Sequence, residues 1–120
     1  MIEKAYREQV ALLLSVLPEV AKEKSLALHG GTAINLFIRE MPRLSVDIDL
    51  TYTRLDSRES ALIGIRTALG GIKARIEKIL RDVRVIDRSD KGKLQISNSR
   101  STVKLEVNLI GRGTIGEPKE

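Results

Sequence analysis

The feature that most constrains the fold is a strictly alternating segment near the C-terminal end, residues 102–110. Apolar residues at every second position face polar ones, with Val103, Leu105, Val107 and Leu109 on one side and Lys104, Glu106 and Asn108 on the other. Successive side chains of a β-strand point to opposite faces, so the pattern predicts a strand with one buried and one polar face. Such a strand fits a sheet that is covered on one side and solvated on the other.

A second strand, residues 45–53, carries two acids. Asp47 and Asp49 alternate with apolar residues, so both carboxylates are expected on one face. Shorter strands are predicted at 26–29, at 83–87 and at 93–98. The last two flank Asp90-Lys91-Gly92, which is typical of a hairpin turn.

Three helices are expected. Apolar residues recur at steps of three and four along 2–24 and 57–82, and a short helix over 32–39 would follow Gly30-Gly31. Together the segments predict an α+β fold, a mixed β-sheet with helices packed on it, in the order α-β-α-β-α-β-β-β.

Two of these predicted helices contain residues that disfavour a helix, and the last has a candidate N-cap residue. Pro18 predicts a kink or a division of the first helix. Gly70-Gly71 lies in the middle of the last helix and costs roughly 2 kcal/mol against two alanines, which would favour a break there. Asp56 or Ser57 is suited to cap that helix.

Composition narrows the classes of protein. With 120 residues the chain has room for one domain. The absence of cysteine excludes disulfides, thiolate zinc sites and cysteine nucleophiles. The sequence contains no run of about 18 apolar residues, the length that a membrane-spanning helix needs. A cytoplasmic location is expected. The net charge of +5 permits a polyanionic partner, but the scarcity of aromatic residues argues against a base-stacking platform.

The two aspartates are the strongest candidates for chemistry. Their α-carbons would lie roughly 6.6 Å apart along the strand, and two such charges repel by about 2.5 kcal/mol at an effective dielectric near 20. The protein can tolerate this repulsion on a solvated strand face, by protonating one carboxyl group, or by binding a cation between the two. Mg²⁺ takes one or two carboxylates and completes its shell with water and phosphates. If the strand of Glu106 lies alongside, three carboxylates would gather on one face and could hold two metal ions. Otherwise Glu106 simply faces solvent.

Other candidates concern phosphate. Gly30 and Gly31 before a helix would offer free amides to a phosphate, or would form only a tight turn. Thr32 would cap that helix or bind phosphate through its hydroxyl. Arg43 would bind a triphosphate or remain on the surface, and Lys104 would neutralise a phosphate or offset Glu106.

These residues resemble a known family. Gly30-Gly31-Thr32-Ala33, followed by Arg43-x-Ser45-x-Asp47-x-Asp49-Leu50, resembles the first motif of the AbiEii/AbiGii-type nucleotidyltransferase toxins of the DNA polymerase β-like nucleotidyltransferase superfamily. Lys104-x-Glu106 is similar to the site of the third carboxylate in that superfamily. The resemblance implies a nucleotidyltransferase-like sheet with these roles: catalytic and metal-holding residues Asp47, Asp49 and Glu106, with Mg²⁺ or Mn²⁺ as cofactor, and nucleotide-binding residues Gly30, Gly31, Thr32, Arg43, Ser45 and Lys104.

The resemblance also implies a function. The family transfers a nucleotide from a nucleoside triphosphate (NTP) to an acceptor, which is tRNA for some members, and many members are toxins controlled by a cognate antitoxin protein. Its members are usually longer, so residues 1–110 are expected to form the nucleotidyltransferase-like domain. Residues 111–120 would then be a linker or disordered tail leading to a C-terminal region that this chain lacks.

Three alternatives remain open at this point. One is a truncated or degenerate module of the same fold that binds a nucleotide, an RNA or a protein partner without catalysis. Another is an RNA-binding α/β domain unrelated to the family. The third is a minimal nucleotidyltransferase of an antitoxin pair, although those proteins usually show Gly-Ser in place of Gly-Gly-Thr.

Overall fold

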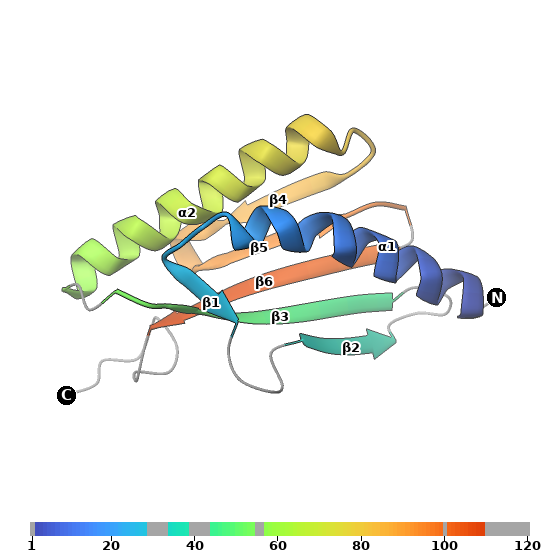
Figure 1. Cartoon of the computed structure of the whole chain (residues 1–120), viewed down its shortest axis with the longest axis horizontal. Coiled ribbons are helices and arrows are strands. Elements are labelled where there is room, and N and C mark those ends of the chain that lie inside the picture. Colours follow the sequence, from blue (N-terminus) through green and yellow to red (C-terminus); the bar gives the residue numbers. More distant parts are fainter. Residues whose placement is uncertain (1, 29–33, 39–43, 55–56, 100, 110–120) are drawn as a thin grey trace.

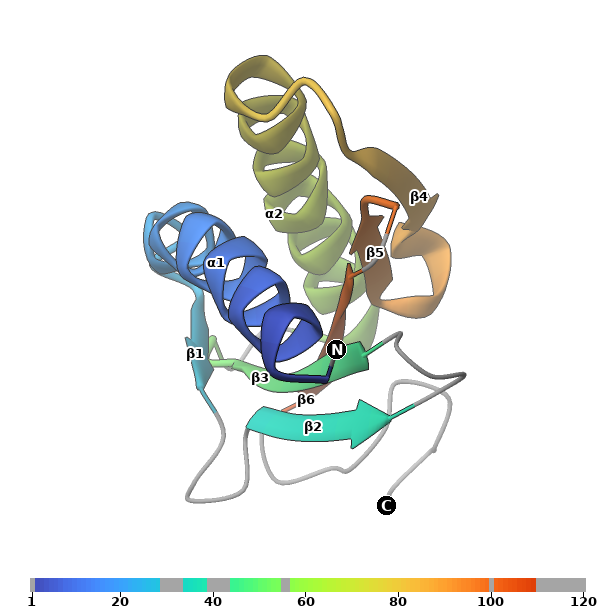
Figure 2. The ribbon, with the colours of Figure 1, turned by 90° about the vertical axis from the view of Figure 1, so that its right-hand side faces the viewer.

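The structure is a computed structural model that describes residues 2–28, 34–38, 44–54, 57–99 and 101–109. Two helices lie on one side of a six-stranded mixed sheet (Figures 1 and 2). The elements, in chain order, are α1 (Ile2–Ala21), β1 (Leu26–Leu28), β2 (Ile34–Ile38), β3 (Leu44–Tyr52), α2 (Arg58–Ile79), β4 (Arg84–Arg88), the short 3-10 helix η1 (Ser89–Lys91), β5 (Lys93–Ser97) and β6 (Ser101–Leu109). The expected α+β fold with helices packed on a mixed sheet is confirmed.

Strand β3 lies at the centre of the site described below. The strands follow the order β1-β3-β6-β5-β4, and β2 also pairs with β3. Strand β6 runs parallel to β3 along its whole length. The antiparallel strands β1 and β2 therefore share the other edge of β3, with β2 beside residues 44–48 and β1 beside residues 50–52.

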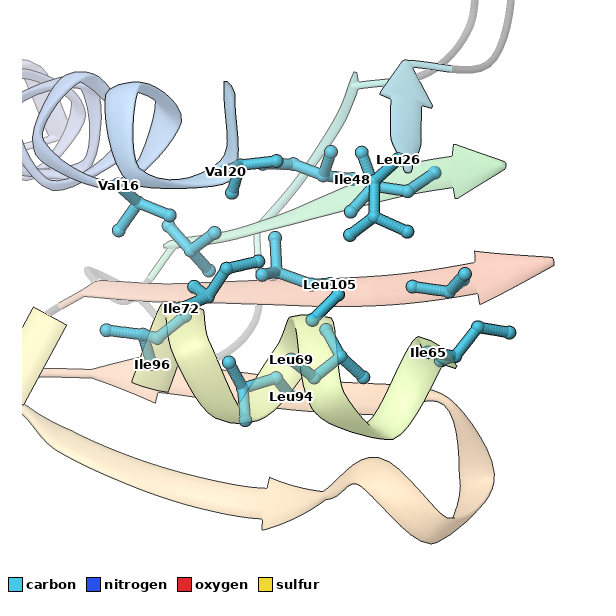
Figure 3. Close-up of a cluster of buried hydrophobic side chains, with 14 of the residues drawn as sticks. Val16, Val20, Leu26, Ile48, Ile65, Leu69, Ile72, Leu94, Ile96 and Leu105 are labelled. Carbon is cyan, nitrogen blue, oxygen red and sulfur yellow. The ribbon is translucent and has the colours of Figure 1, made fainter. Parts of the chain in front are cut away.

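The core lies between this sheet and the helices (Figure 3). Alternate residues of the central strands point toward the helices and are buried; they are Val46, Ile48, Leu50, Leu94, Ile96, Val103, Leu105 and Val107. The helices contribute Leu12, Val16, Val20, Ile65, Leu69, Ile72 and Ile76. Because side chains alternate along a strand, the polar residues between these positions are turned to the opposite face. No helix covers that face in the described part of the chain.

The prediction of a helix over residues 32–39 is wrong, because residues 34–38 form strand β2. The segment Ile-Asn-Leu-Phe-Ile is rich in β-branched and aromatic residues, which favour strands. It also pairs with an edge of β3 whose backbone groups would otherwise need other partners. A helix of about two turns is marginal by itself. The described chain after Gly30-Gly31 thus begins with a strand, so the structure gives no support to phosphate binding by a helix N-terminus there.

Neither helix is divided at these residues. Helix α1 continues through Pro18, whose side chain is exposed, and α2 continues through Gly70 and Gly71. The predicted cap is Ser57, whose hydroxyl oxygen accepts a hydrogen bond from the Ser60 backbone N–H at 3.2 Å. Tertiary packing of one face of each helix outweighs these local penalties.

The glycines of α2 give a matched pair of stability tests. A Cβ atom at Gly70 would meet no atom within 4 Å, whereas one at Gly64 would overlap the phenol of buried Tyr52. We expect Gly70→Ala to raise the free energy of unfolding by about 1 kcal/mol and Gly64→Ala to lower it by about 1–3 kcal/mol. Urea unfolding of both variants measures this. A less stable Gly70→Ala or a more stable Gly64→Ala would contradict the packing of α2.

Candidate functional site

The pairing of β3 with β6 brings the predicted acids together. In the parallel register Asp49 lies opposite Glu106 and Asp47 lies opposite Lys104. All four side chains are half-buried and belong to the face turned away from the helices. Neighbouring strands lie about 4.8 Å apart, so the carboxylates of Asp49 and Glu106 belong to directly adjacent backbone positions.

The core fixes this arrangement. Ile48, Leu50 and Leu105 are fully buried between the sheet and the helices. A slip of one residue in either strand would turn these side chains outward and the acids inward. The hydrophobic alternation that forms the core therefore also determines which charged residues lie together on the sheet face turned away from the helices, hereafter the open face.

The acids suit a metal ion that a substrate helps to bind. Within the described residues, no three acidic or histidine side chains are gathered closely enough to hold an ion by themselves. Of the three carboxylates expected to gather, Asp49 and Glu106 occupy directly paired positions, and Asp47 lies two residues before Asp49 on β3. Carboxylate oxygens are the ligands that Mg²⁺ prefers, and the ion commonly takes one or two of them and leaves the other positions to phosphates and water. The donor set fits this mode of binding.

The acidic pair has a cation beside it, because Lys93 on β5 lies opposite Glu106, but the two groups are not joined in an ion pair. Across the described residues, neither Asp49 nor Glu106 forms an ion pair. Like charges on directly opposite strand positions destabilise a sheet. A local arrangement that opposes stability is typical of a functional site, whereas an entirely structural sheet face has no need of it.

Ser45 and Lys104 lie beside Asp47. Ser45 is only 1% exposed, and its hydroxyl donates a long hydrogen bond to Asp47 Oδ1 at 3.5 Å. That position suits orienting Asp47 better than contacting a phosphate. Lys104 lies opposite Asp47 on β6, where its charge offsets the aspartate.

The other predicted nucleotide-binding residues, Gly30, Gly31, Thr32 and Arg43, lie outside the described residues. Their roles remain predictions. Sequence reasoning missed two basic residues, Lys93 and Arg88, that continue the row of Asp49 and Glu106 across the sheet. The alternation of β4 and β5 would have placed each on a face, but only the strand order places them beside the acids.

Two features lie on the helix side of the sheet, away from these acids. The pKa of Asp87 is lowered by hydrogen bonds from Ser89, whose backbone N–H donates to Asp87 Oδ1 at 2.9 Å, and further by the positive charges of Lys73 and Arg66. This group shapes the hairpin turn. A cavity of about 520 Å³ is lined by residues of α1, of the α2–β4 connection and of the β5–β6 connection, and none of the described candidate site residues lines it.

Comparison with known proteins identifies a family. Residues 11–120 match the family model described as nucleotidyl transferase AbiEii toxin, type IV toxin–antitoxin system. No curated protein and no solved structure matches the chain. Among the described residues, none of the helices has the length and apolar character needed to span a membrane.

Proposed function

The chain belongs to the AbiEii family of nucleotidyl transferase toxins of type IV toxin–antitoxin systems, and from this premise we propose that it transfers a nucleotide from an NTP to an acceptor at the β3–β6 carboxylates. The observation that carries the proposal is the register that sets Asp49 opposite Glu106, two residues from Asp47, on the uncovered face of the described sheet. The proposal therefore assigns the family's nucleotidyl transfer to three carboxylates of this chain.

The proposed reaction is an in-line displacement. A hydroxyl group of the acceptor attacks the α-phosphorus of the NTP, its proton leaves to solvent or a nearby base, and pyrophosphate departs. Asp47, Asp49 and Glu106 would hold Mg²⁺ or Mn²⁺, which when bound neutralises phosphate charge and stabilises the attacking and leaving oxygens.

The chain's other residues would bind and orient. Ser45 fixes the carboxylate of Asp47 through its hydroxyl. Lys104, on the same face, contributes a positive charge next to the phosphates. Contacts from Gly30, Gly31, Thr32 and Arg43 to the phosphates remain part of the proposal, as do an RNA acceptor and a cognate antitoxin as the macromolecular partners.

A second candidate is a non-catalytic module of the same family that binds nucleotide or RNA. One observation favours it: in the described residues no three acidic side chains form a ready metal site. The candidates differ in whether bound nucleotide is transferred.

Transfer of label tests the proposal. The intact chain is incubated with each α-labelled NTP and total cellular RNA, with Mg²⁺, Mn²⁺ or a chelator, and products are separated by size. We expect labelled RNA only when a divalent ion is present. Nucleotide binding without any labelled product, in both metals, would contradict catalysis and favour the second candidate.

A further inference from the structure

The open face of the sheet changes from acidic to basic within one row of residues. Reading across the strands, Asp49 lies opposite Glu106, Glu106 opposite Lys93, and Lys93 opposite Arg88. Paired positions on neighbouring strands point to the same face, so all four side chains share the face that no described helix covers. Two acids on β3 and β6 are thus followed by two bases on β5 and β4.

The basic pair is accessible. Lys93 and Arg88 are both exposed. Within the described chain neither forms an ion pair with a carboxylate. Arg84 belongs to the same face at the other end of β4, opposite Ser97. The outer strands therefore present positive charge, and within the described residues only Lys93 has a carboxylate, that of Glu106, at a paired strand position.

Two like-charged pairs of opposite sign lie side by side in this row. Directly opposite like charges destabilise a sheet, and the attraction between Glu106 and Lys93 in the middle of the row offsets only part of this for each pair. The acidic pair is relieved by a cation and the basic pair by an anion. A ligand that brings phosphates next to a bound metal ion would relieve both at once.

The dimensions favour a chain of phosphates. At about 4.8 Å per strand, the backbone of Lys93 lies roughly 10 Å from that of Asp49, and Arg88 lies roughly 14 Å away at the edge of the sheet. If the reacting end of an RNA strand lay at the carboxylates, the next phosphates of that RNA would lie near Lys93 and Arg88. The chain has one Phe, two Tyr and no Trp, so contacts to the backbone rather than base stacking would supply the binding.

We propose that Lys93 and Arg88 bind the phosphate backbone of an RNA acceptor and guide its end toward Asp49 and Glu106. The role as acceptor guide rests on the proposed nucleotidyl transfer. Binding of RNA to this surface can be measured without it.

The test uses a fluorescently labelled oligouridylate and follows its anisotropy at increasing salt for the intact chain and two double variants. Arg88→Gln/Lys93→Gln removes the proposed contacts. Arg66→Gln/Lys78→Gln removes the same charge from exposed positions of α2, on the other side of the sheet.

We expect the first variant to bind at least about tenfold more weakly and to lose roughly 0.7 from the log–log salt slope for each phosphate contact removed. The control should retain nearly the affinity and slope of the parent chain. Equal losses in both variants, no loss in either, or no RNA binding by the parent would overturn the proposal.

Titration of the same proteins with Mg²⁺ and NTP separates the two sources of phosphate. Unchanged NTP binding in Arg88→Gln/Lys93→Gln, together with weakened RNA binding, supports the acceptor surface. The reverse pattern would make these residues triphosphate ligands and overturn it. Asp47→Asn/Asp49→Asn should lose NTP binding and still bind RNA, so failure of the proposed transfer site is seen independently.

Discussion

Replacement of Asp49 by Asn is expected to lower nucleotidyl transfer by at least about a hundredfold, the scale on which one electrostatic group at a reacting centre acts. The same change should leave stability unchanged or raise it by up to about 1 kcal/mol, because it removes repulsion from Glu106 on the adjacent strand. Label transfer and urea unfolding, measured on the same preparation, report the two effects. Loss of activity without loss of stability separates a chemical role from a structural one.

The matched control for this change is Glu77→Gln. Glu77 is an exposed acid of α2, on the side of the sheet opposite to the carboxylates. It should keep full activity. Unchanged transfer in Asp49→Asn, or an equal fall in Glu77→Gln, would refute the assignment of the reaction to the β3–β6 carboxylates.

The largest expected loss of stability outside the core's apolar side chains comes from Gln9→Met. Gln9 is only 1% exposed; its side-chain Nε2 donates to the Thr102 backbone oxygen, and the Thr102 N–H donates to its Oε1, both at 3.1 Å. Methionine has a similar length but leaves both backbone groups of Thr102 without these partners. At about 1–3 kcal/mol for each of the two unsatisfied groups, the free energy of unfolding should fall by about 2–6 kcal/mol.

Gln95→Met is the control for that change, since Gln95 is a half-buried glutamine of β5 on the open face. It should alter the free energy of unfolding by no more than about 0.5 kcal/mol. If both variants unfold at the same urea concentration as the parent chain, the Gln9 bonds do not hold α1 onto the start of β6.

Much of the fold follows from hydrophobic periodicity. The alternation around Leu105 and Ile48 predicted β6 and β3 to within a residue or two, because each strand is buried on one face only. The predicted helix over 32–39 is wrong because a short apolar run does not distinguish a helix from a strand. The free edge of β3, which decides the matter, is a tertiary feature.

The candidate site was predictable in part for the same reason. The period of two places Asp47 and Asp49 on one face, but it does not say which strand lies alongside. Strand order alone brings Glu106 next to Asp49 and continues the row to Lys93 and Arg88. The bonds from Gln9 to Thr102 join residues 93 positions apart in the sequence, and no local pattern indicates them.

The most direct test of the nucleotide site is calorimetric titration of the intact chain with each NTP, with and without Mg²⁺, alongside the folded Asp47→Asn/Asp49→Asn variant. If the β3–β6 carboxylates hold the metal with the substrate phosphates, the intact chain binds at least one NTP only when Mg²⁺ is present, and the variant does not bind it. Equal binding by the variant, or no binding of any NTP by the folded intact chain, would contradict the site.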